Sequence, residues 1–243
     1  MAKYIVLCVI IVIATIVYGL ILFWLDKCVF VNRLARKILT HSKWTYEEIR
    51  ASLIGVVYYL FPLMILVPMF IIFRFDIFCY LLIKPSYLFY ILLTILAEFS
   101  AVTLTSGLLT MFSEKTDWTN EIRNIVWIQS IKKRNPSVAP FVPLLGSLAE
   151  EFFFRGFIFL FMYTQFPQFG FVFPMLWSSI LFALQQILFT KNSKQGLSMI
   201  LGSVMINLIG CIAIVYTGSM LPGIIAHACF VFFYIGRMKV FAS

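Results

Sequence analysis

Charged side chains are scarce in this sequence: Asp, Glu, Lys and Arg make up 12% of the 243 residues, while 62% are hydrophobic. Soluble domains carry about 25% charged residues. The apolar residues also come in runs of roughly 20, the length that a helix needs to cross a bilayer. The composition therefore excludes an ordinary soluble domain and predicts an integral membrane protein.

Paired cysteines are missing as well. The five cysteines are scattered, mostly inside apolar runs, and no CxxC pair occurs. This pattern excludes a disulfide framework or a cysteine metal cage and is typical of small buried hydrophobic side chains. The net charge of +9 does not indicate nucleic-acid binding. The cations lie in the gaps between apolar runs, where they set topology and contact anionic lipid.

Seven apolar segments follow one another along the chain. Each is near the ~20 residues that span ~30 Å of hydrocarbon, and such long uniform runs favour helices over barrel strands. The predicted fold class is therefore all-α, a polytopic membrane bundle of about seven transmembrane helices. The segments cover residues 4–25, 52–73, 86–112, 138–163, 170–190, 197–216 and 219–236.

The predicted organisation is one membrane unit with two regions. Residues 1–137 hold the first three spans and the basic loops, and residues 138–243 hold the polar motifs. The first apolar run is too long for the 7–15 residues of a signal-peptide core, and no cleavage site follows it. We therefore interpret that run as the first span.

Lysine and arginine predict the orientation. Alternate gaps hold 15 of these cations, while the gaps between them hold two. The positive-inside rule then places the N-terminus outside and the C-terminus in the cytoplasm, and we expect the cell membrane as the location. The basic loops 26–51 and 113–137 are expected to form amphipathic helices at the lipid interface.

The stretch "EEFFFRG" places three charged side chains inside the fourth segment. Ionisable groups in a bilayer face the bundle interior and have partners. Glu151 and Arg155 are four residues apart, on one helix face, so they can pair, and Glu150 points about 100° away. The free carboxylate of Glu150 suits a general base acting on water. The alternative is that the Glu–Arg pair only holds helices together, although that role needs only one glutamate.

Other polar residues lie in the later segments. Gln185 and Gln186 are near the end of the fifth, and His227 is in the seventh. Asn207 and Glu98 lie in the sixth and third, and each alone is typical of a hydrogen bond between helices. If the fourth, fifth and seventh helices are neighbours, Glu150, Glu151, Arg155, Gln186 and His227 converge on one cavity.

These motifs resemble those of the CPBP family, the CAAX proteases and bacteriocin-processing enzymes also called Abi, which are intramembrane proteases. "EEFFFRG" is similar to its EExxxR motif. Its FxxxH motif corresponds to "FALQQ", Phe182 to Gln186, where glutamine replaces histidine. Its HxxxN motif corresponds to His227 in "TGSMLPGIIAHACFV", where Val231 replaces asparagine. The resemblance covers about residues 138–231.

The resemblance implies a role for each of these residues. Glu150 would be the base that activates water, with Glu151 and Arg155 as its supporting pair. His227 would bind the water or the oxyanion, and Gln186 would keep a hydrogen-bond donor without a proton-transfer role. Zinc is disfavoured, because one histidine and two glutamates are a poor match to the usual three-ligand sites. No cofactor is predicted.

Three hypotheses remain open at this point. The first is an intramembrane endopeptidase that cuts a membrane-associated peptide such as a leader or a prenylated tail. The second is a catalytically impaired protein of the same fold that acts as an immunity, scaffold or regulatory partner, since Gln186 and Val231 depart from the motifs. The third is a small transporter, which predicts broken helices or paired repeats that the sequence does not show.

Overall fold

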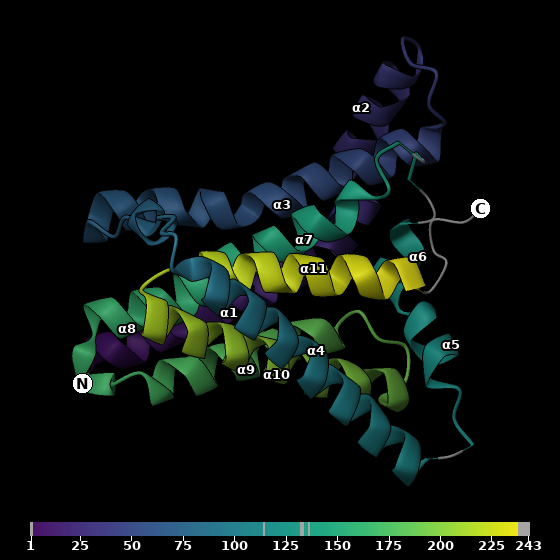
Figure 1. Ribbon diagram of the computed structural model, residues 1–243. Coiled ribbons are helices and arrows are strands. Elements are labelled where there is room, and N and C mark those ends of the chain that lie inside the picture. The colour runs from purple at the N-terminus through teal and green to yellow at the C-terminus, as the bar shows by residue number, and fades with distance from the viewer. Residues whose placement is uncertain (1, 114, 132–133, 136, 238–243) are drawn as a thin grey trace.

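The computed structural model of the chain describes residues 2–113, 115–131, 134–135 and 137–237. Every regular element in these ranges is a helix, as Figure 1 shows. In chain order the elements are α1 (Ala2–Lys27), α2 (Val29–Leu39), α3 (Tyr46–Phe73), η1 (Ile77–Tyr80), α4 (Tyr87–Phe112), α5 (Trp118–Arg123), α6 (Val126–Ile131), α7 (Phe141–Glu150), η2 (Glu151–Leu160), α8 (Phe161–Gln165), η3 (Pro167–Phe169), α9 (Val172–Ile187), α10 (Ser193–Thr217) and α11 (Leu221–Arg237).

The seven apolar segments all form helices, which confirms the predicted all-α membrane bundle. Helices α1, α3, α4 and α10 each contain an apolar stretch long enough to cross a membrane, and α9 and α11 are shorter apolar helices. The fourth segment is divided into α7, η2 and α8, which follow one another without a break from Phe141 to Gln165. The chain is therefore a polytopic integral membrane protein.

The basic loops gather at one end of the bundle. In Figure 1 the C-terminal end of α1 and the N-terminal end of α3 lie at the same end as α5 and α6. The helices between them run back and forth, as the alternation of cations predicts. Lys132, Lys133 and Lys239, which contribute to that alternation, lie outside the described residues. Which membrane face this end occupies stays a prediction.

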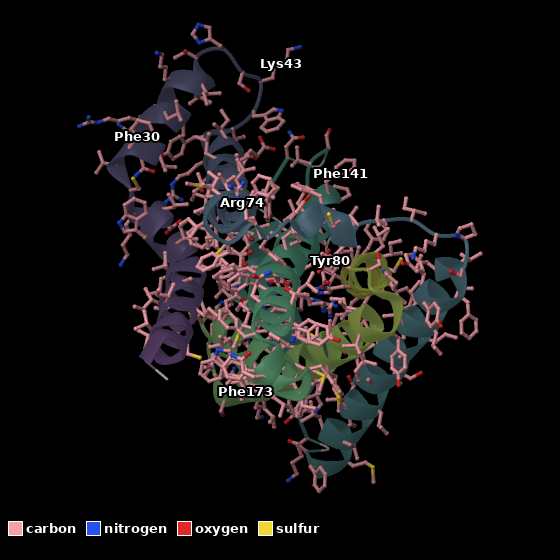
Figure 2. The ribbon with its side chains drawn as sticks, turned by 90° about the vertical axis from the view of Figure 1, so that its left-hand side faces the viewer. Phe30, Lys43, Arg74, Tyr80, Phe141 and Phe173 are labelled. Carbon is pink, nitrogen blue, oxygen red and sulfur yellow. The ribbon has the colours of Figure 1, made fainter. Side chains whose placement is uncertain are left out.

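Local sequence determines where α3 begins. The backbone N–H of Glu48 donates to Thr45 Oγ1 at 3.3 Å, and the backbone N–H of Thr45 donates to Glu48 Oε2 at 2.7 Å. This reciprocal capping box satisfies two amide groups at the helix start. Ahead of it, the arm formed by α2 projects from the bundle and carries Phe30, and Lys43 follows on the loop (Figure 2).

Aromatic side chains of η2 form the core that positions the polar segment. Phe153 and Phe154 are buried. The Phe153 ring lies 4.6 Å from the Tyr18 ring of α1, and the Phe154 ring lies 4.6 Å from the Phe182 ring of α9. Such aromatic contacts stabilise a core beyond the area they bury. They hold η2 between α1 and α9, with Glu151 at the start of the packed segment and Glu150 directly before it.

Candidate active site

The two adjacent glutamates lie at the junction of α7 and η2. Helix α7 ends at Glu150, and η2, a π-helix, begins at Glu151 and continues to Leu160. The spacing predicts an ordinary α-helix through this region, so the wider π turn is a difference that the apolar pattern does not reveal. Wide turns of this kind occur often at functional sites. Here the turn contains both members of the predicted ion pair.

Glu151 is buried between two basic side chains. Its Oε1 atom forms an ion pair with Arg155 and accepts a hydrogen bond from His227 Nδ1 at 2.7 Å. All three side chains are nearly inaccessible, at 2%, 1% and 3% exposure for Glu151, Arg155 and His227. The carboxylate therefore joins η2 to α11 and fixes the orientation of the imidazole, since a bound Nδ1 turns Nε2 the opposite way.

Arg155 occupies space that two glycines leave open. A Cβ on Gly210 of α10 would collide with its guanidinium, and one on Gly223 of α11 would lie 2.9 Å from its Nη1. The guanidinium also donates from Nη2 to the carbonyl of Ile206. The glycines are therefore required by packing at this point, and Arg155 connects η2 with both C-terminal helices.

Glu98 reaches the same arginine from α4. It is completely buried, and its Oε1 lies 3.7 Å from Arg155 Nη2. Neither carboxylate oxygen has a hydrogen-bond partner in the part of the chain that the structure describes. The sequence left the role of Glu98 open between the cavity and a local hydrogen bond. The structure places it behind Arg155 as a second counter-ion.

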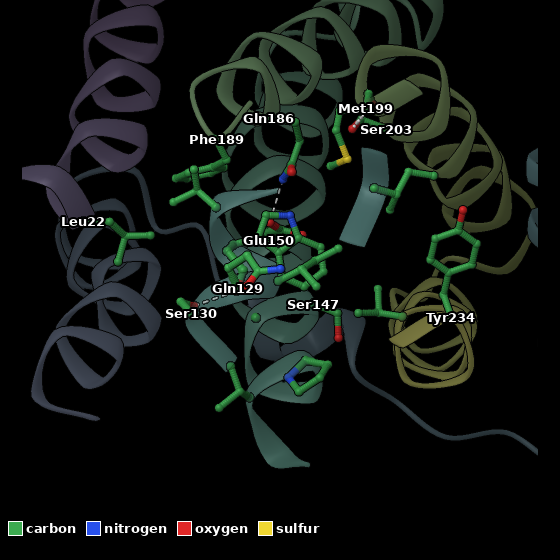
Figure 3. A pocket seen from close by; sticks show the side chains of 18 of the residues that line it. Leu22, Gln129, Ser130, Ser147, Glu150, Gln186, Phe189, Met199, Ser203 and Tyr234 are labelled. Carbon is green, nitrogen blue, oxygen red and sulfur yellow. Dashed lines mark hydrogen bonds between the residues drawn. The ribbon is translucent and has the colours of Figure 1, made fainter. Parts of the chain in front are cut away.

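Glu150 faces a cavity of about 490 Å³, and its side chain is 17% exposed. Gln186 Nε2 donates to Glu150 Oε1 at 2.8 Å, as the dashed line in Figure 3 shows. On the other side, Glu150 Oε2 lies 3.8 Å from His227 Nε2. Glu150, Gln186 and His227 all line the cavity, so the expected convergence of α7, α9 and α11 is found. Glu151 and Arg155 lie behind this surface.

The two glutamines at the end of α9 have different surroundings. Gln186 bonds to Glu150 and to Gln185 Oε1, at 2.8 and 2.9 Å. Gln185 donates instead to the hydroxyl of Tyr58, at 2.8 Å. Of the pair, Gln186 is therefore the residue that contacts the candidate base, as the FxxxH spacing indicates. Both amide hydrogens of Gln186 are engaged, since its single nitrogen makes two hydrogen bonds.

Two other residues of the predicted spans differ in whether their side chains can form hydrogen bonds. Asn207 Nδ2 donates to Ser178 Oγ at 3.1 Å and Ser179 Oγ at 3.0 Å, joining α10 to α9 as expected for a lone amide in a span. Val231, which replaces the third-motif asparagine, lines the cavity one turn after His227. Its isopropyl group offers no donor there.

Sequence reasoning missed Arg134 and Tyr59, which also line the cavity. Arg134 belongs to a basic loop whose charges were all attributed to topology. Its position directly before the fourth span was the available signal. Tyr59 lies in an apolar run among other aromatic residues, and nothing in the pattern distinguishes it.

The cavity does not fit a catalytic zinc ion. Such sites use three protein ligands, whereas Glu151 and His227 Nδ1 bind each other here, which leaves Glu150 and His227 Nε2 facing the cavity. Within the described ranges, no group of three or more His, Cys, Asp or Glu side chains could hold a metal ion. The chemistry below is therefore derived from the side chains alone.

Comparison with known proteins gives one match. Residues 134–233 match the family model of type II CAAX prenyl endopeptidase Rce1-like proteins. The match begins just before α7 and ends in α11, so it contains Glu150, Gln186 and His227. Neither a search of curated proteins nor one of solved structures found a match. The region that carries the three motifs is therefore similar to CAAX-type intramembrane proteases, which confirms the family resemblance inferred from the sequence.

Proposed function

We propose that this chain is an intramembrane endopeptidase that hydrolyses a peptide bond in a membrane-associated peptide. The observation that carries the proposal is the placement of the Glu150 carboxylate at a cavity surface, 3.8 Å from His227 Nε2. A water beside these atoms can lie about 2.8 Å from each, which is hydrogen-bonding distance. The family match to residues 134–233 supports the same class of reaction.

Glu150 is the proposed general base. It takes a proton from the water while the water oxygen attacks the carbonyl carbon, and it then delivers that proton to the leaving nitrogen as the C–N bond breaks. The products are a carboxylic acid and an amine, and the proton of the acid then passes to the amine to give a carboxylate and an ammonium group. Gln186 holds the Glu150 carboxylate in place through its 2.8 Å hydrogen bond.

His227 is the proposed partner of the water and the oxyanion. Glu151 accepts a hydrogen bond from its Nδ1–H, which orients the ring and stabilises the doubly protonated form. In that form Nε2–H can donate to the oxygen that becomes negative during attack. Arg155 keeps the supporting glutamate charged, and Glu98 balances the arginine.

The cavity suits a peptide that carries an apolar anchor. Side chains of α4, α10 and α11 such as Val102, Met199 and Phe230 form an apolar wall, whereas Arg134 and Lys191 add positive charge to the lining. A prenylated C-terminal segment combines these properties, and it is the kind of substrate that the matched family's name describes. By the positive-inside rule, we place the basic end of the bundle on the cytoplasmic side of the cell membrane.

The proposal is tested by cleavage of a farnesylated CAAX-type peptide with the purified full-length protein. We expect Glu150→Gln to lower the rate at least 10²-fold, since general-base catalysis contributes about 10²–10⁴. Melting of the variant in detergent controls for folding. Unchanged cleavage by a folded Glu150→Gln protein would rule out this role for Glu150.

A second candidate function is a membrane protein that binds such a peptide without cutting it. Two observations favour it: both amide hydrogens of Gln186 are engaged, and Val231 places no donor in the cavity. Loss of one oxyanion donor typically costs about 10²–10³ in rate. If the wild type is inactive and Gln186→His with Val231→Asn restores cleavage, binding is the natural function.

A further inference from the structure

Arg134, one of the arginines that line the cavity, has no ion-pair partner among the residues that the structure describes. Arg50 also lines the cavity, but its Nη2 lies 2.9 Å from Asp26 Oδ1 and its Nε donates to Asn32 Oδ1 at 2.8 Å. No ion pair of Arg134 occurs within the ranges that the structure describes, although Glu47 is also on the cavity wall. Arg134 therefore offers a positive charge without a counter-ion.

Packing holds the Arg134 side chain in place. Its guanidinium lies against Gly55 of α3, where a Cβ would be 2.7 Å from Nη1 and 2.8 Å from Nη2. The next residue, Asn135, donates to Glu48 Oε1 at 3.1 Å, which ties the loop to the start of α3. Arg134 Nε is buried and has no hydrogen-bond partner among the described residues.

Burial lowers the pKa of the Arg134 guanidinium, because a charged group loses solvation when it leaves water. Arginine nevertheless stays protonated in proteins. A fixed, partly desolvated cation with a free donor is a favourable partner for a carboxylate, whose two oxygens match the guanidinium fork. The structure thus supplies the donor half of an anion site.

The distance from Arg134 to the hydrolytic centre can be judged along α3. Gly55, which contacts Arg134, lies one helical turn from Tyr59, or about 6 Å along the axis. The Tyr59 ring lies about 4.0 Å from the position of a Cβ on Gly146 in α7, which is one helical turn before Glu150. Helices α3 and α7 both start at the basic end of the bundle, so Arg134 and Glu150 lie about two turns, or roughly 12 Å, apart along the axis. An extended peptide covers about 3.3 Å per residue, so three or four residues join the two levels.

We propose that Arg134 binds the free C-terminal carboxylate of the peptide, with the scissile bond three or four residues before it at Glu150. The inference rests on the proposed function and assigns recognition of the substrate's terminal carboxylate to a residue outside the three motifs. A lipid phosphate has similar chemistry, but continuity of the cavity from Arg134 to Glu150 favours the peptide.

The test measures binding, so it does not depend on turnover. The full-length protein with Glu150→Gln is titrated in neutral detergent against two fluorescent peptides, followed by anisotropy. Both peptides carry a farnesylated cysteine as the fourth residue from the C-terminus, and they differ only in ending as a carboxylate or as a carboxamide. We expect the carboxylate to bind about 10- to 100-fold more tightly, the range of a charge-assisted hydrogen bond.

Variants then locate the interaction. Adding Arg134→Gln should reduce the ratio of the two peptide affinities to about one. Arg134→Lys should retain part of the preference, because a lysine keeps the charge but loses the two parallel N–H donors of the guanidinium. The matched control is Arg50→Gln, whose guanidinium already pairs with Asp26, and it should keep the preference. Gly55→Ala, which displaces the guanidinium, provides a second test if Arg134→Gln does not fold.

Several results would overturn the proposal. They are equal binding of the two peptides, no binding of either, a preference that survives Arg134→Gln, or one that Arg50→Gln removes to the same extent. Loss of the preference on adding anionic lipid vesicles, with the peptides still bound, would assign Arg134 to lipid phosphate. Failure of the wild type to cleave, with the carboxylate preference intact, would remove the proposed hydrolysis and leave this proposal supported.

Discussion

The two adjacent glutamates should respond differently when each is changed to glutamine. Glu151 is 2% exposed, and its charge balances Arg155 and orients His227. Breaking a buried ion pair from one side costs about 3–5 kcal/mol. Because Glu98 still lies 3.7 Å from Arg155, the charge is not wholly uncompensated. We therefore expect Glu151→Gln to cost about 3 kcal/mol, the lower end of that range.

Glu150→Gln should lower the free energy of unfolding much less than Glu151→Gln does. The Glu150 side chain is 17% exposed to the cavity, and within the described part of the chain its one hydrogen bond comes from Gln186. A glutamine retains an acceptor oxygen for that bond, and a typical hydrogen bond contributes about 1 kcal/mol. We expect a cost of about 1 kcal/mol or less, with activity lost because an amide cannot take a proton.

Thermal unfolding in detergent, followed by tryptophan fluorescence, separates the two variants. A change of 1 kcal/mol shifts the melting temperature by about 2–4 °C for a chain of 150–250 residues. Glu151→Gln should therefore lower it by about 6–12 °C, and Glu150→Gln by about 2–4 °C at most. Equal shifts for the two variants, or a larger one for Glu150→Gln, would refute the division between a supporting glutamate and a reactive one.

Two further predictions follow from the same site. Gly210→Ala should lower stability by about 1–3 kcal/mol, since its Cβ would collide with Arg155. By contrast, Gly202→Ala on the same helix meets nothing within 4 Å and should be neutral or stabilising, so equal melting of the two variants would contradict this packing. We also expect 1,10-phenanthroline to leave cleavage unchanged, because Glu150 and His227 do not make a three-ligand zinc site, and inhibition that added zinc reverses would show otherwise.

The sequence predicted the fold well because the bilayer imposes a simple pattern. A run of about 20 apolar residues must be helical if it crosses hydrocarbon, where every backbone group needs an internal partner. Charge alternation then determines which ends lie together. The apolar runs and the charge alternation are both local features of the sequence, so they can be recognised without knowing how the helices pack.

Helix neighbours could not be predicted in the same way. Lipid-facing and core-facing side chains are both apolar here, so nothing in α4 shows that Glu98 approaches Arg155. Convergence of Glu150, Gln186 and His227 was an inference from polar side chains inside apolar segments together with an assumed adjacency of their helices. The π turn that begins at Glu151 also leaves no trace, since it changes hydrogen bonding and not composition.

Arg134 shows a different limit. A cation in a basic loop has the same sequence signature whether it meets water, lipid or a substrate. Only the contact of its guanidinium with Gly55, which leaves no room for a Cβ, distinguishes it from its neighbours. A single glycine nearly 80 positions away therefore carries information that a search for charged motifs does not use.

The glycines around Arg155 also bear on how a bulky peptide enters. A Cβ on Gly223 would lie 3.5 Å from the Cα of Gly210, so the backbones of α10 and α11 almost touch there. Because these two helices are in such close contact, with one guanidinium packed against both, we expect them to move together as one rigid unit. Under the proposed function, we therefore expect a peptide from the lipid to enter between other helices that line the cavity, such as α1 and α3, and not between α10 and α11.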